Sequence, residues 1–181
     1  MAPEPAPPRA ENCTYQYDDN ALQPADPDLV IPWADAVAKL AEAGTYWSAT
    51  LRPDGRPHVR PVFAVWVDGR LCTTSNPTVR KGRNLAGDGR CSCAAPTDGI
   101  DFVVEGTATA ITDPDLLERV AEAYRSKYGW PVTVVDGAFD APFGAPAAGP
   151  PPYQPYAIAP RTIYGFGTDE RFAYASTRWR F

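Results

Sequence analysis

Tight turns between apolar runs constrain the fold of this 181-residue chain more than any other feature of its sequence. Pro53-Asp54-Gly55 separates an apolar run over residues 45–52 from a second over 57–67. Asp68-Gly69 separates the second run from a third over residues 71–75. Asp-Gly between apolar runs is typical of β-hairpins, because hairpin turns favour residues that tolerate a positive φ. The pattern therefore predicts an antiparallel meander and argues against repeated strand–helix–strand units.

The rest of the chain supplies further strands and a few helices. Four more runs have the composition of strands, at residues 90–95, 101–111, 156–167 and 172–180. Helices are expected at residues 32–43, 77–87 and 113–128. For the second helix, Asn76 is the expected N-cap and Pro77 the expected first residue. Gly106 and Ala108 favour close packing or sharp curvature, as a barrel requires. Together these elements predict a β-rich α+β domain of six or seven antiparallel strands with about three peripheral helices.

The formal charge of −5 is concentrated near the N-terminus. Residues 1–30 hold six acids and one base, which leaves 16 acids and 16 bases for residues 31–181. We expect residues 1–30 to form an acidic, proline-rich arm, flexible or loosely docked on a domain that spans residues 31–181. Within that domain, residues 131–155 form a Pro/Gly/Ala-rich loop that is too long for an ordinary connection. The balanced charge of the domain argues against nucleic acid as a partner.

Several classes of chemistry lack the residues they need. His58 is the only histidine, so a metal site with several histidines is excluded. A catalytic triad that needs a histidine would have to use His58. The chain has neither the glycine-rich motifs that cradle phosphates nor the elbow that carries a nucleophilic serine. No metal site and no catalytic residue is therefore assigned.

The sequence also bears on the compartment. No apolar run approaches the about 18 residues of a membrane span, and no secretory signal is visible. Two of the four cysteines, Cys91 and Cys93, are one residue apart, which matches neither a zinc motif nor a redox motif. We expect all four cysteines to be reduced, in a cytoplasmic protein without a membrane partner.

The segment from Thr73 to Asn84 combines features that suit a phosphate group. The predicted strand ends in three hydroxyl residues, 73–75, and the helix that follows carries Arg80, Lys81 and Arg83. Free N–H groups at a helix start, hydroxyl donors and fixed cations together favour an anion. The alternative is a turn whose hydroxyls cap the helix and whose cations are solvated.

A second candidate segment carries two prolines in a strand-like run. Pro57 and Pro61 flank His58, and proline removes a donor from the ladder, so this strand is expected at an edge or a bulge. Unpaired backbone groups there could hydrogen-bond to a planar ring. The alternative is an edge strand protected against aggregation.

These segments, in this order, resemble the pyridoxamine-phosphate-oxidase-like split β-barrel superfamily. Within it, the chain is most similar to the branch of deazaflavin (coenzyme F420)-dependent or FMN-binding oxidoreductases. The resemblance covers about residues 32–181 and is carried by Ala49–Val59 with Pro61-Val62, by Arg80–Leu85, by Val104–Ala108 and by Ser176–Phe181.

The resemblance implies a homodimer that binds F420, or FMN as the second choice, at the dimer interface. It implies a phosphate site on residues after the third strand and on the basic helix, namely Thr73, Thr74, Ser75, Arg80, Lys81 and Asn84. The cofactor ring would lie along the proline-containing strand, at His58, Val59, Arg60, Pro61 and Val62. The activity implied is hydride transfer between this cofactor and a small organic substrate.

Three alternatives remain open at this point. The first is a carrier that binds a flavin or F420 without turnover. The second is a haem-binding or haem-degrading relative, for which His58 is the one available imidazole. The third is oxidation of pyridoxamine phosphate itself.

Overall fold

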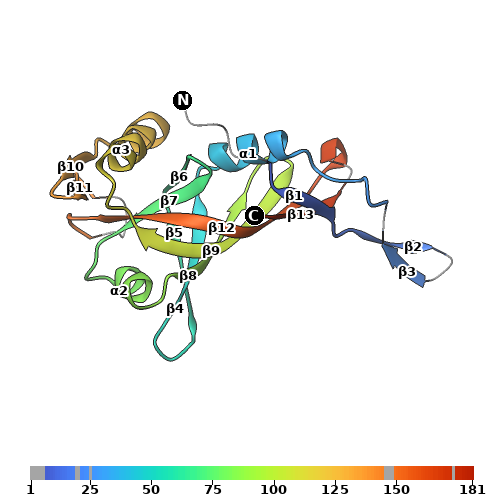
Figure 1. Ribbon diagram of the computed structural model, residues 1–181, viewed down its shortest axis with the longest axis horizontal. Helices are drawn as coiled ribbons and strands as arrows, with labels where there is room; N and C mark the ends of the chain where they lie inside the picture. Colours follow the sequence, from blue (N-terminus) through green and yellow to red (C-terminus); the bar gives the residue numbers. More distant parts are fainter. Residues whose placement is uncertain (1–6, 19–20, 25, 145–148, 173) are drawn as a thin grey trace.

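The computed structural model describes residues 7–18, 21–24, 26–144, 149–172 and 174–181 (Figure 1). Its main feature is an antiparallel sheet of nine strands. The strands are β1 (Arg9–Asn12), β4 (Tyr46–Leu51), β5 (Pro57–Val62), β6 (Ala64–Val67), β7 (Arg70–Ser75), β8 (Arg90–Pro96), β9 (Ile100–Ala110), β12 (Gln154–Gly167) and β13 (Ser176–Arg180). The helices are α1 (Trp33–Glu42), α2 (Arg80–Gly87) and α3 (Pro114–Tyr128), with a 3-10 turn at Glu170–Phe172. The predicted β-rich α+β fold with three helices is confirmed.

The sheet is folded around its longest strand, β12. Along the path β1-β13-β12-β9-β8-β4-β5 each strand pairs with its neighbours, and β7 joins as a further partner of β12. The first part of β12 lies between β7 and β9, whereas its last part lies between β13 and β9. The sheet therefore divides at β12, as expected for a split barrel.

Both predicted hairpins are present. The β4–β5 hairpin pairs Leu51 with Pro57, and Gly55 takes a φ of 79° in its turn. The β6–β7 hairpin turns at Asp68 and Gly69, whose φ values are 50° and 72°. Such left-handed pairs match the twist of a two-residue hairpin. The run predicted as one strand over 57–67 forms two strands, β5 and β6, because the strand is interrupted at Phe63.

Close packing at Gly106 explains why a small residue stands there. A Cβ at this position would lie 2.2 Å from the carbonyl oxygen of Ala159. On the facing strand the register shifts between Pro160 and Thr162, which marks a bulge. The curvature predicted from Gly106 therefore has a physical basis in the contact between β9 and β12.

Two buried clusters fill the space around the sheet. The larger includes Leu40 of α1, Phe102 of β9 and Trp179 of β13. The smaller lies under α3 and includes Tyr124 and Tyr153. At the α3 end of the molecule lies a small hairpin of β10 (Thr133–Val135) and β11 (Ala138–Asp140), and at the opposite end lies that of β2 (Tyr15–Asp18) and β3 (Ala21–Pro24) (Figure 1).

The prediction of a loose N-terminal arm is wrong for part of residues 1–30. Strand β1 pairs with β13 over four residues, and Glu11 accepts hydrogen bonds from the Arg178 guanidinium. The absence of periodicity in the arm was misleading because an edge strand paired on one side needs no alternating apolar face. Residues 1–6, 19–20 and 25 lie outside the described part of the chain.

Three other boundaries differ from expectation. Helix α2 begins at Arg80 rather than Pro77, because the Asn76 side chain accepts hydrogen bonds from the backbone N–H and the hydroxyl of Thr78 and closes a turn instead of a cap. The loop predicted over residues 131–155 contains the β10–β11 hairpin. The last strand begins at Ser176, after the 3-10 turn, rather than at residue 172.

Candidate cofactor-binding site

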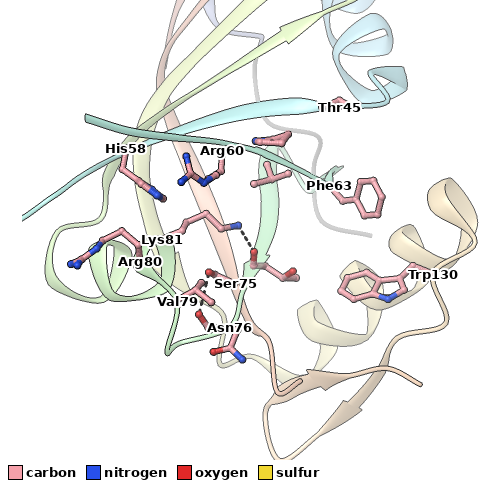
Figure 2. Close-up of a pocket in the computed structure, with 13 residues that line it drawn as sticks. Thr45, His58, Arg60, Phe63, Ser75, Asn76, Val79, Arg80, Lys81 and Trp130 are labelled. Carbon is pink, nitrogen blue, oxygen red and sulfur yellow. Dashed lines mark hydrogen bonds between the residues drawn. The ribbon is translucent and has the colours of Figure 1, made fainter. Parts of the chain in front are cut away.

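A cavity of about 380 Å³ lies between β5, the end of β7 and the start of α2 (Figure 2). This volume falls within the range of small-molecule sites. The lining residues are Thr45, His58, Arg60, Pro61, Val62, Phe63, Thr74, Ser75, Asn76, Val79, Arg80, Lys81 and Trp130. The two candidate segments of the sequence therefore meet at one cavity.

Eight of the eleven predicted site residues line this cavity. From β5 these are His58, Arg60, Pro61 and Val62, and from the end of β7 and the start of α2 they are Thr74, Ser75, Arg80 and Lys81. Val59 does not line the cavity, and its side chain is 44% exposed next to the buried His58.

The other two predicted residues are used inside the protein. The hydroxyl of Thr73 is buried and donates to the carbonyl oxygen of Phe63 at 3.2 Å. The side-chain amide of Asn84 is buried below α2 and donates to the hydroxyl of Thr50 at 3.0 Å. Neither side chain lines the cavity, and both join neighbouring elements of the fold.

One end of the cavity is cationic. Arg60, Arg80 and Lys81 form no ion pair with any acid in the described part of the chain. No acidic side chain is among the described residues that line the cavity. The first turn of α2 adds backbone N–H groups that no side chain caps. This end is therefore suited to an anion.

Lys81 is held in place by the strand opposite it. Its ammonium group donates to the carbonyl oxygen of Thr74 at 2.6 Å, the contact drawn as a dashed line in Figure 2. Burial lowers the pKa of Lys81 to about 8. An anion bound beside Lys81 would raise this pKa, because a nearby negative charge favours the charged form of the lysine.

His58 presents an unused hydrogen-bonding atom. The residue is 5% exposed, and its buried Nδ1 has no partner within the described protein. Burial lowers the pKa of His58, and the charges of Arg60 and Arg52 lower it further. The imidazole is therefore neutral at pH 7, and its ring lies on the same side of the cavity as Lys81 (Figure 2). A buried ring nitrogen without a partner costs free energy.

Five lining residues were missed by the sequence reasoning: Thr45, Phe63, Asn76, Val79 and Trp130. Phe63 directly follows Val62, so continuing the predicted segment by one residue would have included it. The sequence predicts Asn76 only as a helix cap. Trp130 follows the glycine that ends α3, and no local pattern relates this position to β5.

The described residues hold no group of three or more His, Cys, Asp or Glu side chains that could bind a metal ion. All four cysteines are free. No helix in the described ranges is long and apolar enough to span a membrane.

Comparison with known proteins identifies the family. The sequence model described as pyridoxamine 5'-phosphate oxidase matches residues 33–167, which include the whole cavity. The chain belongs to the pyridoxamine 5'-phosphate oxidase family. No match is found among the curated proteins.

Three solved structures share the fold of this chain. A conserved hypothetical protein from Mycobacterium tuberculosis is 21% identical, with a TM-score of 0.59 over 78% of this chain and 88% of that one. A haem-binding protein from Mycobacterium smegmatis is 17% identical, with a TM-score of 0.62 over 82% of this chain and 58% of that one. A pyridoxamine 5'-phosphate oxidase-related, FMN-binding protein from Nostoc punctiforme is 18% identical, with a TM-score of 0.53 over 82% of this chain and 89% of that one. The chain therefore shares its fold with these three structures.

Proposed function

We propose that the protein is an oxidoreductase that binds F420 or FMN in this cavity and transfers a hydride between the cofactor and a small organic substrate. The observation that carries the proposal is that one cavity has a cationic end with no acid among the described lining residues and also a wall on β5 to which Pro61 and Val62 contribute. A flavin-type cofactor has the same two parts, a phosphate and a flat ring.

The residues present fit such a group. Arg80 and Lys81 would bind the phosphate, with Thr74 and Ser75 as nearby hydroxyl donors. The ring would lie along β5, where His58, Pro61 and Val62 line the cavity. The cofactor supplies the hydride when bound, so the chain needs no nucleophile or metal of its own. Its residues bind and orient the reacting rings.

The decisive experiment identifies what the protein carries. We expect an absorbance spectrum and a mass spectrum of the purified protein to show a flavin or deazaflavin, and titration of the apo-protein to show binding of F420 or FMN. Binding of neither would overturn the proposal. A cofactor that binds but is not reoxidised by a broad panel of acceptors would favour the carrier alternative.

Haem binding is the second candidate, favoured by the place of His58, the only histidine, in the lining of the cavity. In that case the spectrum shows a Soret band, and His58→Ala abolishes it. A flavin spectrum that survives His58→Ala argues for the first proposal. Turnover of pyridoxamine phosphate by the FMN-loaded protein would favour the remaining alternative.

Affinity for a phosphate-bearing cofactor is expected to fall as the pH rises above about 8. Lys81 loses its proton near this pH, and the anion then loses a charged partner. The neutral His58 and the thiol of Cys93, whose pKa burial raises to about 11, do not titrate between pH 7 and 9.5. One proton limits the slope to about tenfold per pH unit. Calorimetric titration of the cofactor over this range measures it.

The matched control is Lys81→Arg, because a guanidinium stays charged over the whole range. This variant is expected to bind the cofactor with nearly constant affinity from pH 7 to 9.5. An unchanged fall in the arginine variant would assign the pH dependence to another group.

We further propose that the protein is a homodimer, joined through the outward face of β4, β5 and β12. Trp47 and Val59 are 48% and 44% exposed, and the register places them on one face of the β4–β5 hairpin. The same register continues through β8 and β9 to Tyr164 of β12. The ring of Tyr164 stacks on that of Phe166, with centroids 6.2 Å apart. An exposed apolar stripe of this extent is typical of an interface between subunits.

Trp47→Asp is expected to shift the protein from dimer to monomer in sedimentation velocity. Burying an unpaired carboxylate at an interface costs free energy, and the variant also loses the apolar contacts of the tryptophan. Val135→Asp is the control, because Val135 is also 48% exposed but lies on β10, away from this face. A monomeric unsubstituted protein, or dissociation by both variants, would contradict the proposed interface.

A further inference from the structure

The turn that leads into α2 is held by the side chain of Asn76. Its Oδ1 accepts hydrogen bonds of 2.7 Å from both the backbone N–H and the hydroxyl of Thr78. Asn76 is 5% exposed and lines the cavity, as do Val79, Arg80 and Lys81 (Figure 2). The side chain therefore fixes the backbone directly before the cations of the cavity.

The same side chain joins this turn to a segment distant in sequence. Nδ2 of Asn76 donates to the carbonyl oxygen of Pro150 at 2.7 Å. Gly149 also lies against the turn, because a Cβ at this position would be 3.9 Å from Asn76 Nδ2 and 3.9 Å from a methyl group of Val79. Segment 149–153 therefore supports the turn from the side opposite Thr78.

Segment 149–153 is itself fixed to the core. Tyr153 is fully buried, and its hydroxyl donates to the carbonyl oxygen of Gly149 at 2.6 Å. The backbone of Tyr153 exchanges two hydrogen bonds of 2.8 Å with that of Phe139, and its ring packs edge-on against Trp130. Asn76 therefore connects the core to the turn from which the cations follow.

The cations at the start of α2 depend on the position of this turn. Gly82 lies against the carbonyl oxygen of Asn76, so the helix packs directly on the turn. Neither Arg80 nor Lys81 forms an ion pair with an acid among the described residues. Because no carboxylate holds these two side chains, their place in the cavity follows the backbone that carries them.

We propose that Asn76 is a positioning residue that sets where Arg80 and Lys81 meet the cofactor phosphate. It does so by tying the turn to Thr78 and to Pro150. The inference rests on the proposed function, which gives the cationic end to the phosphate and β5 to the ring. When the turn moves, the cations lose their geometry toward the anion, whereas the contacts of the ring remain. Asn76 thereby determines how strongly the protein prefers a phosphorylated cofactor to the same ring without phosphate.

The test compares a phosphorylated cofactor with its ring lacking the phosphate. The apo-protein is titrated by calorimetry with FMN and with riboflavin. If the protein binds F420 instead, F420 and its deazariboflavin fragment, which lacks the phosphate, replace them. We expect Asn76→Ala to weaken binding of the phosphorylated ligand about 3- to 30-fold and binding of the phosphate-free ligand less than about twofold. A variant with only a general loss of structure would change both affinities alike.

Asn12 provides a matched control, because it makes the same pair of contacts outside the cavity lining. Its Oδ1 accepts from the backbone N–H of Thr14 at 2.7 Å, and its Nδ2 donates to the carbonyl oxygen of Asp26. Asn12→Ala is expected to keep the preference for the phosphorylated ligand within about twofold. Thr78→Val removes only one of the hydrogen bonds to Asn76, so it is a milder variant and is expected to give a smaller loss for the same ligand.

Three results would overturn the inference while the cofactor still binds. These are equal affinity of the unsubstituted protein for the two ligands, equal losses for both ligands in Asn76→Ala, and an equal loss of preference in Asn12→Ala.

Failure of the proposed function gives a different result, in which neither F420 nor FMN binds. The same variants are then titrated with inorganic phosphate. Phosphate binding that is weakened by Asn76→Ala and not by Asn12→Ala supports the positioning role at an anion site without the cofactor. No binding of phosphate, or binding that Asn76→Ala leaves unchanged, overturns it.

Discussion

Replacing Lys81 by alanine is expected to weaken cofactor binding by about 10- to 150-fold. Lys81 places its ammonium group at the cationic end of the cavity, between the end of β7 and the first turn of α2. A charge-assisted hydrogen bond contributes about 1.5–3 kcal/mol, which corresponds to this loss in affinity. Calorimetric titration of the apo-protein with F420 and with FMN at pH 7 measures the effect.

Arg83→Ala is the control for this experiment. Arg83 belongs to the same helix and its loss changes the net charge equally, but its side chain lines a separate hollow with Arg52 and Asp88. Its variant is expected to keep the cofactor affinity within about twofold. Equal losses in the two variants would mean that the anion responds to the overall charge of α2 rather than to contact with Lys81.

Gly82→Ala is expected to destabilise the fold and to weaken cofactor binding together. A Cβ on Gly82 would lie 2.2 Å from the carbonyl oxygen of Asn76 and 2.9 Å from the Cα of Pro77, both backbone atoms. Helix α2 would have to move away from the end of β7, and Lys81 would move with it. We expect the free energy of unfolding to fall by about 2–3 kcal/mol, near the upper end for overpacking. The melting temperature should fall by roughly 5–10 °C.

Gly87→Ala gives a comparison within the same helix. Nothing lies within 4 Å of a Cβ at this position. Because alanine is a better helix former than glycine, this variant is expected to leave stability unchanged or to raise it slightly. Thermal unfolding followed by circular dichroism measures both variants. A Gly82→Ala protein as stable as the Gly87→Ala protein, with normal affinity, would contradict the role of this contact.

The hairpins and helices were predictable because their signals are local. Asp68-Gly69 needs only its own backbone to favour a hairpin, and the spacing of apolar residues in α3 defines one buried face. The pairing of β1 with β13 was not predictable, because it joins segments at opposite ends of the chain. The start of α2 was misplaced for a smaller reason: the Asn76 side chain has two ways to satisfy a backbone N–H, and the structure uses the turn.

For the candidate site too, the residues with local sequence signals were predictable and those placed by tertiary packing were not. The segments 58–62 and 74–81 were predictable because each carries a local chemical signal. Segment 58–62 has prolines in a strand, and segment 74–81 has cations near hydroxyls. Thr73 and Asn84 resemble their neighbours in sequence, but their side chains donate within the protein, to the carbonyl oxygen of Phe63 and to the hydroxyl of Thr50. Trp130 reaches the cavity only through tertiary packing, which no local pattern encodes.

The position of β12 in the chain has a consequence for folding during synthesis. Strands β7 and β9 are made well before their shared partner, so their edges stay unpaired until residues 154–167 leave the ribosome. Pairings between segments so distant in sequence make folding slow. Open strand edges in the incomplete chain also invite association with other chains. The nascent protein is therefore expected to depend on chaperones until β12 is available.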